Sequence, residues 1–258
     1  MAHLRPPMAP RDISELPEYL RFRVGHSTVT DGNMSYSFGP RAAVLLARQR
    51  FFAGQDLPPE RLIPFFTEHR EIITDIPAYD FDGCSLSHPP RFISDANVLQ
   101  IPGAGIFLGF ADCVPFVVYD ARQHLLAFAH VGWRSMAAGL TGKLLRHLMQ
   151  HHGSRPQDLY GVIGPSIKPE SYRFADPIQA QNRVWQPFLR PQPDGRTGID
   201  LYGFCTQEVH SAGVPPDQLY AFRTDTATDP TLFSHYAATV NGQRHKQGRF
   251  FFYGWLDE

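Results

Sequence analysis

The chain has 258 residues and a formal net charge of −1, and 43% of its residues are hydrophobic and 13% aromatic. This composition supplies ample material for a buried core, and it argues against both a disordered chain and an electrostatic nucleic-acid binder. Because the longest apolar runs have the length of strands, far short of the roughly 20 residues that a membrane span needs, we predict one soluble cytoplasmic domain with no nucleic-acid or membrane partner.

The N-terminal part of the chain predicts an arm followed by a strand. Residues 1–18 contain no apolar signal core and are expected to form a flexible arm, so the folded domain is placed at residues 19–258. A first short strand is expected over residues 19–24. A polar, glycine-containing loop follows over residues 25–39.

The next stretch predicts a helix and then bent or broken strand structure. Residues 41–54, RAAVLLARQRFFAG, have the composition and length of a helix. Residues 63–76 carry apolar residues on both sides of a polar group, which predicts two short strands or one bent strand with His69 near the bend. Residues 77–90 are expected to form an irregular surface segment.

The stretch from 111 to 135, ADCVPFVVYDARQHLLAFAHVGWRS, predicts a β-hairpin. The polar turn DARQH, residues 120–124, separates two apolar runs. The midpoint between Cys113 and His130 falls in the middle of this turn. Pairing of the two runs would therefore set the thiol and the imidazole opposite each other, with Cβ atoms about 5 Å apart. A metal ion or a proton could bridge them there.

The second half of the chain alternates irregularly between helices and strands. Residues 135–152 place leucines at helical intervals, with Ser135 as a possible N-cap and Gly153 as a stop. The irregular order predicts a mixed α/β fold with mixed sheets and helices outside. Further expected elements are strands at 97–99 and 159–165, short and longer helices at 182–189 and 202–212, and closing strands at 219–223 and 249–256.

Cysteine and histidine usage limits the kind of metal site. Cys84, Cys113 and Cys205 form no CxxC pair and are odd in number, which argues against a disulfide framework and a cysteine-rich structural zinc site. Twelve histidines are present, but no HxH pair of the kind expected at a multicopper centre occurs. Cys84 is expected to be a loop residue.

Cys113 and His130 have two chemical interpretations. As a nucleophile with its base, they would lie within about 2.6–3.2 Å, with a third group orienting the histidine. As zinc ligands they need a third protein ligand, and His69 is the best candidate. A structural alternative stays open, in which Cys113 is a small buried hydrophobic residue and His130 a core histidine.

The sequence Trp133-Arg134-Ser135 lies where the hairpin passes into the predicted helix. Backbone N–H groups of a first helical turn and the Arg134 guanidinium would converge there, which is typical of a phosphate site. The alternative is an arginine exposed at a helix start.

Three motifs are present together in this chain: ADCVP from Ala111, HVGWRS from His130 and GPSIKPESYRF from Gly164. They resemble the patterns ADCxP, HAGWRG and GPxIGPxxYEV of the YfiH-like family. Older usage names this the laccase-domain or polyphenol oxidase family, and its members are now regarded as zinc-dependent purine nucleoside phosphorylases. The similarity covers most of the chain from about Phe22 onward and is strongest over 95–172.

The resemblance implies zinc ligands at His69, Cys113 and His130, although QVHG of the family reads TEHR around His69. It places the arginine of the HAGWRG pattern at Arg134, which we expect to bind phosphate with Ser135 beside it. It also implies an α/β/β/α layered fold, a cytosolic catalytic domain, and cleavage of adenosine, inosine or methylthioadenosine by phosphate, with adenosine deamination as a further activity. We expect a monomer or weak oligomer.

Several positions depart from the family patterns. A glutamate of the family is Arg173 here, a Cys-Thr pair is Asp225-Thr226, and FSYR reads FSHY with Tyr236 in the arginine position. These changes lie where a small-molecule pocket would be lined. A second hypothesis is therefore a homologue that keeps the metal or the nucleoside but has lost turnover. A copper polyphenol oxidase ranks third, because the chain lacks HxH pairs.

Overall fold

Two strands that are buried along their whole length lie at the centre of the molecule. β8 (Val114–Asp120) and β9 (Leu125–Val131) pair as an antiparallel hairpin, and every residue of both is buried. Side chains alternate along a strand, so Phe116 packs against helices on one face, whereas Val117 packs against a second sheet on the other. Both faces are covered, which explains the uninterrupted apolar runs.

The structure is a computed structural model that describes residues 8–78, 81, 86 and 92–258, so Cys84 lies outside the described residues. Within them, the hairpin belongs to a seven-stranded mixed sheet of order β1-β14-β10-β8-β9-β6-β4. The other strands of this sheet are β1 (Arg11–Asp12), β4 (Ile73–Ile76), β6 (Ala96–Leu99), β10 (Leu159–Ile163) and β14 (Leu219–Ala221).

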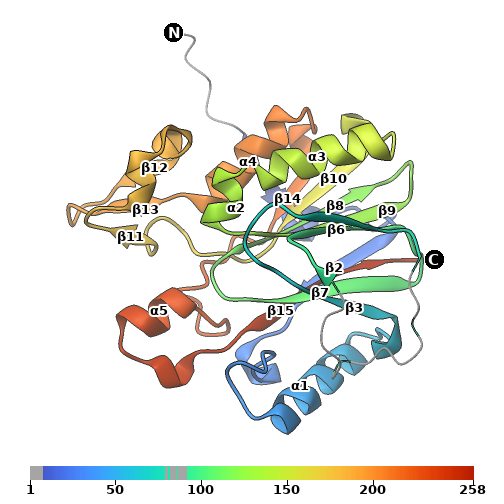
Figure 1. The fold of residues 1–258 in the computed structure, drawn as a ribbon, viewed down its shortest axis with the longest axis horizontal. Helices are drawn as coiled ribbons and strands as arrows, with labels where there is room; N and C mark the ends of the chain where they lie inside the picture. The colour runs from blue at the N-terminus through green and yellow to red at the C-terminus, as the bar shows by residue number, and fades with distance from the viewer. Residues whose placement is uncertain (1–7, 79–80, 82–85, 87–91) are drawn as a thin grey trace.

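Three helices cover the outer face of this sheet (Figure 1). They are α2 (Trp133–Ala137), α3 (Leu140–His151) and α4 (Leu201–Ser211). Leu140, Leu144 and Leu148 of α3 are fully buried against the sheet, as their helical spacing predicts. In the part of the chain that the structure describes, no helix is both long and apolar enough to cross a membrane.

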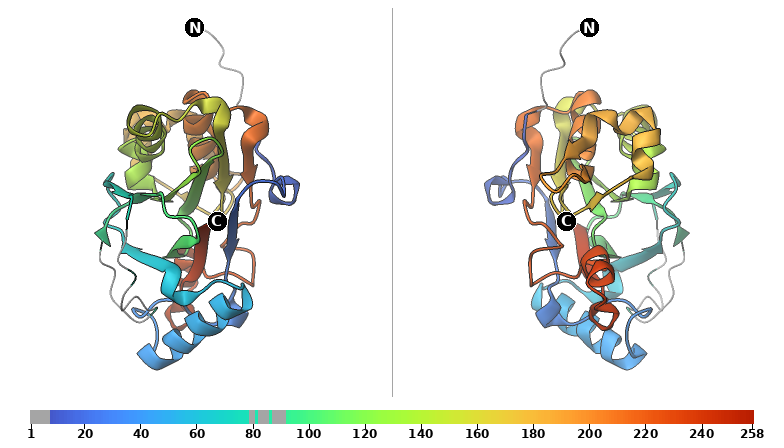
Figure 2. Two further views of the ribbon diagram at one scale, coloured as in Figure 1. Left: turned by 90° about the vertical axis from the view of Figure 1, so that its right-hand side faces the viewer. Right: turned by 90° about the vertical axis from the view of Figure 1, so that its left-hand side faces the viewer.

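A second sheet packs against the inner face of the first. Its order among the described residues is β2-β15-β7-β3-β5. Its strands are β2 (Phe22–His26), β3 (Leu62–Phe66), β5 (Phe92–Ile93), β7 (Ala104–Phe110) and β15 (Phe250–Leu256). Helix α1 (Arg41–Gly54) closes the far side, where Phe52 contacts the rings of Phe107 and Phe251. Figures 1 and 2 show the resulting α/β/β/α order, which confirms the predicted layered fold.

A smaller unit projects from one side of the sandwich, at the left of Figure 1. It contains the three-stranded sheet β11-β13-β12, formed by Arg173–Phe174, Thr197–Ile199 and Leu189–Pro191, and the short helix α5 (His235–Val240). The hydroxyl of Tyr236 donates to the carbonyl of Arg173 at 2.7 Å and joins the two parts. The sequence did not predict this unit.

The predicted helices at 41–54 and 135–152 have different outcomes in the structure. The helix at 41–54 is confirmed, whereas the single helix at 135–152 is wrong, because Gly139 takes φ 81° and separates α2 from α3. Ser135 is not an N-cap. It lies in the first turn of α2, and its hydroxyl accepts a hydrogen bond from the Gly132 N–H at 2.9 Å.

The hairpin is confirmed, but its predicted register is wrong. His130 lies opposite Pro115 rather than opposite Cys113. The turn is centred one residue later than expected, because the Asp120 carboxylate accepts from the N–H groups of Arg122 and Gln123 and His124 takes φ 51°. Continuing the register sets Cys113 opposite Gly132, which makes it a diagonal neighbour of His130 on the same face.

Part of the predicted N-terminal arm is attached to the sheet. Arg11–Asp12 forms β1 and pairs with β14 in parallel. The Asp12 carboxylate then caps a short 3-10 helix, Ile13–Glu15, by accepting from the Ser14 N–H at 3.0 Å. The start of the folded domain at residue 19 stays a prediction.

Candidate metal centre and the cavities beside it

Three metal-binding side chains meet where the chain passes between the two sheets. His69 lies on the connection from β3 to β4, and Cys113 lies on the connection from β7 to β8. Both connections lead from the five-stranded sheet to the seven-stranded sheet. His130 comes from β9, on the strand face that points between the sheets. Two connections between the sheets and the end of β9 therefore bring distant parts of the sequence together at one edge of the sandwich.

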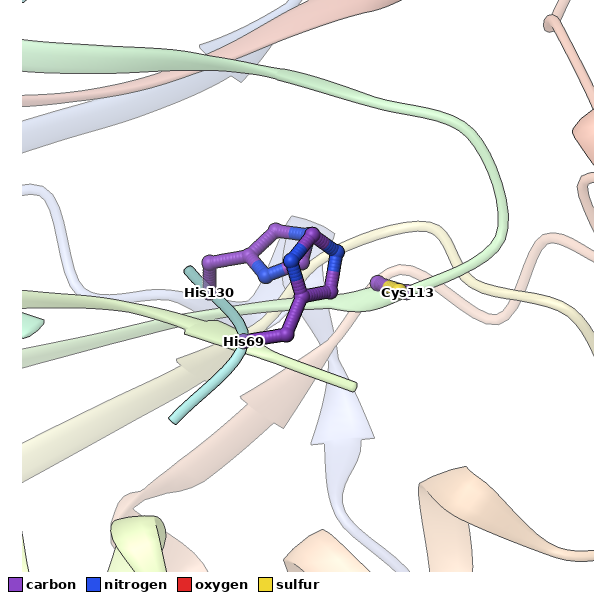
Figure 3. Close-up of side chains that lie close together, drawn as sticks. All are labelled: His69, Cys113 and His130. Carbon is purple, nitrogen blue, oxygen red and sulfur yellow. The ribbon is translucent and has the colours of Figure 1, made fainter. Parts of the chain in front are cut away.

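The three side chains of this triad lie close together (Figure 3). One candidate ligand atom from each of His69, Cys113 and His130 lies within 4.8 Å of the other two. The two imidazole rings meet edge to face, with centroids 4.7 Å apart. The His130 ring also stacks on Phe110 at 5.0 Å, which restricts its orientation. Two imidazoles and one thiol form a donor set that suits zinc.

Gly132 leaves the space that the triad occupies. A Cβ atom at this position would lie 3.1 Å from the sulfur of Cys113 and 3.7 Å from Cδ2 of His69. The first distance is shorter than ordinary van der Waals contact. A glycine opposite Cys113 in the hairpin therefore lets the thiol and the imidazole approach.

Asp95 holds the loop that carries His69. Its carboxylate is fully buried and accepts four hydrogen bonds from this loop. The donors are the Thr67 hydroxyl at 2.5 Å and the N–H groups of Glu68 at 3.1 Å, Arg70 at 3.0 Å and Ile72 at 3.2 Å. His69 takes φ 61°, a conformation that a non-glycine residue adopts when its surroundings impose it.

Asp112 fastens the residue next to Cys113 to the C-terminal part of the chain. Its carboxylate accepts from the hydroxyls of Thr226 at 2.8 Å and Ser234 at 2.6 Å and from the N–H of Tyr236 at 2.7 Å. Burial raises the pKa of Asp112, and these three hydrogen bonds oppose the effect. Asp112 thereby fixes the start of α5 beside the triad.

The protonation of the triad distinguishes its two chemical interpretations. Burial raises the pKa of the Cys113 thiol to about 12, and Asp112 adds to the effect. Burial, with His69 as a second cause, lowers the pKa of His130 to about 3. At pH 7 the pair is a neutral thiol and a neutral imidazole, which argues against an unassisted nucleophile and base. A divalent cation would supply the positive charge that a buried thiolate lacks.

A further observation bears on whether these residues fit a metal. The Nδ1 atom of His130 is buried and has no hydrogen-bond partner among the described residues. An unpaired buried polar atom costs free energy, and a metal ligand is one partner that removes the cost. Donor chemistry, proximity and this unpaired nitrogen therefore all fit zinc. The role of the three residues as ligands stays a prediction.

Two cavities share Cys113 and Ala111 in their walls. The larger, which we call the arginine cavity, has a volume of about 510 Å³. The smaller, the aromatic cavity, has a volume of about 240 Å³. Residues that line the arginine cavity include Tyr36, Arg41, Arg48, His69, His130 and Arg249, and those of the aromatic cavity include Trp133, Tyr172, Phe174, Leu201, His235 and Tyr236.

The arginines of the larger cavity differ in what they contact. Arg48 donates to the carbonyls of Met34 and Leu86 and packs on the Tyr36 ring at 4.0 Å, so it holds the cavity wall. Arg249 packs on Phe38 at 4.4 Å, and among the described residues it has no ion pair. Burial lowers the pKa of Arg249, and the negative charge of Asp112 opposes the effect. Its Nη1 donates to the Gly248 carbonyl at 2.7 Å. A partly buried guanidinium without an ion pair among the described residues can bind an anion beside the triad.

The predicted phosphate residues lie on the opposite side of the triad. Arg134 is exposed, and its guanidinium stacks at 4.2 Å on Trp133, which lines the aromatic cavity. Ser135 is fully buried, and its hydroxyl bonds to the N–H and the carbonyl of Gly132. The use of this hydroxyl within the turn argues against a contact with phosphate, and the role of Ser135 stays a prediction.

The positions that depart from the family patterns have separate surroundings. Tyr236 lines the aromatic cavity. Arg173 pairs with Asp194 at 3.0 Å, and Asp225 accepts from the Ser171 hydroxyl at 2.6 Å. Of the three positions, Tyr236 is therefore the one placed to contact a small molecule.

Residues that sequence reasoning missed are Asp95, Gly132 and Arg249. Asp95 directly precedes a buried strand, and an acidic side chain at such a position is a signal for a buried polar contact. Gly132 lies inside the HVGWRS motif. Arg249 had no local signal, because its place beside Cys113 depends on how β15 pairs with β7.

Comparison with known proteins matches the chain to one family and to relatives that carry the same name. The model of a family described as multi-copper polyphenol oxidoreductase laccase matches residues 23–257. A purine nucleoside phosphorylase of Bacteroides thetaiotaomicron is 27% identical over 175 residues, which are 66% of this chain and 65% of that protein. Purine nucleoside phosphorylase YlmD of Geobacillus stearothermophilus is 31% identical over 137 residues, which are 50% of each chain. The matched part thus spans less than two thirds of either relative.

Solved structures share the fold over a longer span. The crystal structure of YlmD from Geobacillus stearothermophilus has a TM-score of 0.80 at 24% identity and covers 92% of this chain and 93% of that one. The hypothetical protein YfiH of Bacillus licheniformis has a TM-score of 0.78 at 22% identity, with the same coverage of both chains. The layered sandwich is therefore common to all three chains.

Proposed function

The chain belongs to the multi-copper polyphenol oxidoreductase laccase family, and we propose that it acts as a zinc-dependent purine nucleoside phosphorylase. The observation that carries the proposal is the convergence of His69, Cys113 and His130 at the junction of two cavities. The names of the relatives from Bacteroides and Geobacillus support the reaction class. The substrates proposed are adenosine, inosine or methylthioadenosine together with phosphate.

In this reaction the C1′–N9 bond of the nucleoside breaks and a bond from C1′ to a phosphate oxygen forms. The base leaves with the bonding electron pair and takes up a proton. We propose that His69, Cys113 and His130 hold the zinc ion, which as a Lewis acid supplies positive charge beside the substrate.

The aromatic cavity is the proposed site of the purine base. Trp133, Phe174 and Tyr236 offer ring faces on which a base can stack, a contact worth about 1–3 kcal/mol per base in proteins that bind single strands. Burial raises the pKa of Tyr172 above its ordinary value, so its hydroxyl keeps its proton at pH 7. Tyr172 can therefore donate a hydrogen bond to a ring nitrogen.

The arginines on the two sides of the triad are the proposed phosphate ligands. Arg249 lines the arginine cavity, and Arg134 lies outside the aromatic cavity on Trp133. Guanidinium groups bind phosphate oxygens through paired N–H donors. We favour Arg249, because it is partly buried beside Cys113 and has no ion pair among the described residues, whereas Arg134 is exposed.

The copper oxidase reaction is the less favoured alternative. Passing electrons to oxygen requires several copper sites rich in imidazole. The sequence contains no HxH pair. In the described residues the triad next to the cavities includes a single thiol and two imidazoles.

The test measures metal content, free base and ribose 1-phosphate with inosine or adenosine as substrate, and it follows ammonia for deamination. We expect zinc, and base release that requires phosphate. Arg249→Gln is expected to raise the KM for phosphate about 10–100-fold, the loss of one charge-assisted contact. Arg196→Gln, in an exposed turn, is the matched control, and Arg134→Gln separates the two phosphate candidates.

Three outcomes would contradict the proposal. Zinc and nucleoside bound without any product would indicate a homologue that has lost turnover. Oxidation of phenols with oxygen uptake after copper loading would favour the oxidase. Release of base at the same rate without phosphate would indicate hydrolysis instead of phosphorolysis.

A further inference from the structure

A second group of metal-binding side chains lies on the helical side of the molecule, apart from the triad. Asp75 belongs to β4, whereas His147 and His152 lie at the C-terminal end of α3. One ligand atom from each of the three lies within 4.8 Å of the other two. We propose that these residues form a second site for a divalent transition-metal ion with nitrogen and oxygen ligands only.

The Asp75 carboxylate already joins the two imidazoles. Nε2 of His147 lies 3.0 Å from Oδ1 and 3.1 Å from Oδ2 of Asp75, and Nε2 of His152 lies 2.8 Å from Oδ1. Zinc binds imidazole nitrogen and carboxylate oxygen at about 2.0–2.2 Å, so neighbouring ligand atoms around a tetrahedral ion are roughly 3.3–3.5 Å apart. An outward shift of a few tenths of an ångström would admit the ion.

Burial and charge favour a cation at this place. The side chains of His147 and His152 are 20% and 11% exposed, so their rings are already held in position. His152 is the C-cap of α3, where the carbonyl ends of the helix attract positive charge. Three protein ligands leave further coordination positions for water, as in known zinc sites.

The position of the site gives it a structural consequence. Within the described residues, β4 is the last strand of the seven-stranded sheet. Only one neighbour, β6, holds it by hydrogen bonds. A metal ion between Asp75 and α3 would attach this edge strand to the helical layer. β4 starts at Ile73, just after the loop that carries His69.

Zinc binding to protein without a polyhistidine tag tests the site. We expect two equivalents of zinc in the wild type and one in Asp75→Asn or His147→Gln. Zinc affinity at the second site should fall by more than roughly 10–100-fold, the loss that follows when a metal ligand loses a hydrogen-bond partner. Cys113→Ser/His130→Asn, which removes the triad, should keep one equivalent. His151→Gln is the matched control, because the His151 ring lies 4.6 Å from the His147 ring but His151 is outside the group.

Two readouts separate this site from the triad. X-ray absorption of zinc in the Cys113→Ser/His130→Asn protein should show nitrogen and oxygen neighbours without sulfur. Zinc should also raise the Tm of the Cys113→Ser/His130→Asn protein. Adding Asp75→Asn to this protein should abolish the Tm shift, while its circular dichroism spectrum without metal stays unchanged. No zinc in the Cys113→Ser/His130→Asn protein, or the same number of equivalents in Asp75→Asn as in the wild type, would overturn the proposal. Loss of the phosphorylase proposal would leave it intact, since no measurement here uses turnover.

Discussion

Two buried aspartates flank the triad of His69, Cys113 and His130, and they form hydrogen bonds over very different spans of sequence. The Asp95 carboxylate takes four hydrogen bonds from the loop 67–72, which lies 23 to 28 residues before it. The Asp112 carboxylate takes three hydrogen bonds from partners 114, 122 and 124 residues later in the chain. The first holds a candidate metal ligand, His69. The second holds Tyr236, a wall of the aromatic cavity.

The difference indicates a division of tasks around one site. Asp95 shapes a local loop whose backbone conformation would otherwise be unfavourable at His69. Asp112 instead connects the triad to a segment that folds next to it only when the whole domain is formed. We therefore expect Asp95 to control metal affinity and Asp112 to control substrate binding.

Asp95→Asn should give the largest effect. Either orientation of the amide leaves two of the four donors without an acceptor, at about 1–3 kcal/mol each, so we expect a loss of roughly 2–6 kcal/mol in the free energy of unfolding. Zinc affinity should fall about 10–100-fold. Urea unfolding and chelator competition measure both, with the exposed Asp176→Asn as the control. Unchanged zinc affinity would show that the loop does not depend on Asp95.

Asp112→Asn should have a smaller and different effect. The amide oxygen can still accept from Thr226 and Ser234, but the amide nitrogen then faces the Tyr236 N–H. We expect a loss of about 1–3 kcal/mol in the free energy of unfolding and a higher KM for the nucleoside, with zinc affinity nearly unchanged. A variant that loses zinc and keeps its KM would reverse the assigned tasks.

The contributions of His130 and Asp112 to the pH dependence of stability should have opposite signs. The pKa of His130 is lowered to about 3, so between pH 3 and about 6.5 the unfolded chain binds more protons at this residue, and the free energy of unfolding rises with pH. The raised pKa of Asp112 acts in the opposite direction above its ordinary value of 3.8.

This prediction is measured on metal-free protein by urea unfolding from pH 4.5 to 7.5. One proton contributes at most about 1.4 kcal/mol per pH unit. His130→Asn should lower the slope over this range, and the difference between variant and wild type isolates the His130 contribution. An equal slope in both proteins would mean that the folded state does not disfavour the charged imidazole.

Gly132→Ala should give the smallest effect, and it tests the space beside Cys113 and His69. Its new Cβ would lie 3.1 Å from the Cys113 sulfur, so a shift of a few tenths of an ångström is required. We expect a cost near 1 kcal/mol, the low end for an overpacked site, and a zinc affinity lower by about tenfold or less. Gly54→Ala is the control, because nothing lies within 4 Å of its Cβ position. Unaltered zinc affinity would place the metal away from Gly132.

The sequence alone predicts most of the strands and helices, because their signals are local, whereas the α/β/β/α order was expected from the family resemblance. The runs that form β8 and β9 and the leucines of α3 report burial directly through their spacing. The hairpin register shifted by one turn position because Asp120 and His124 shape the turn, and no apolar pattern encodes that choice. The break at Gly139 was missed for a similar reason, since the spacing of leucines continues across it.

The candidate site was predictable only in part. Cys113 and His130 stand in one hairpin, so their proximity could be expected from the chain order. His69 was the best candidate for a third ligand, but no local pattern places it beside the hairpin. Asp95 and Arg249 act through contacts between elements far apart in sequence. Ser135 is not the predicted N-cap because its hydroxyl bonds to Gly132 within its own turn, which only coordinates reveal.

The aromatic cavity has a consequence for how this protein can change. Its walls are drawn largely from residues 167–174 and 235–239, whereas the triad is drawn from residues 69–130. If the cavity binds the base and the triad binds the metal, as proposed, base preference and metal binding depend on separate stretches of polypeptide. Randomising the late segments in a library should then change the nucleoside preference and leave metal binding at the triad in place, and grafting them between homologues should transfer the preference.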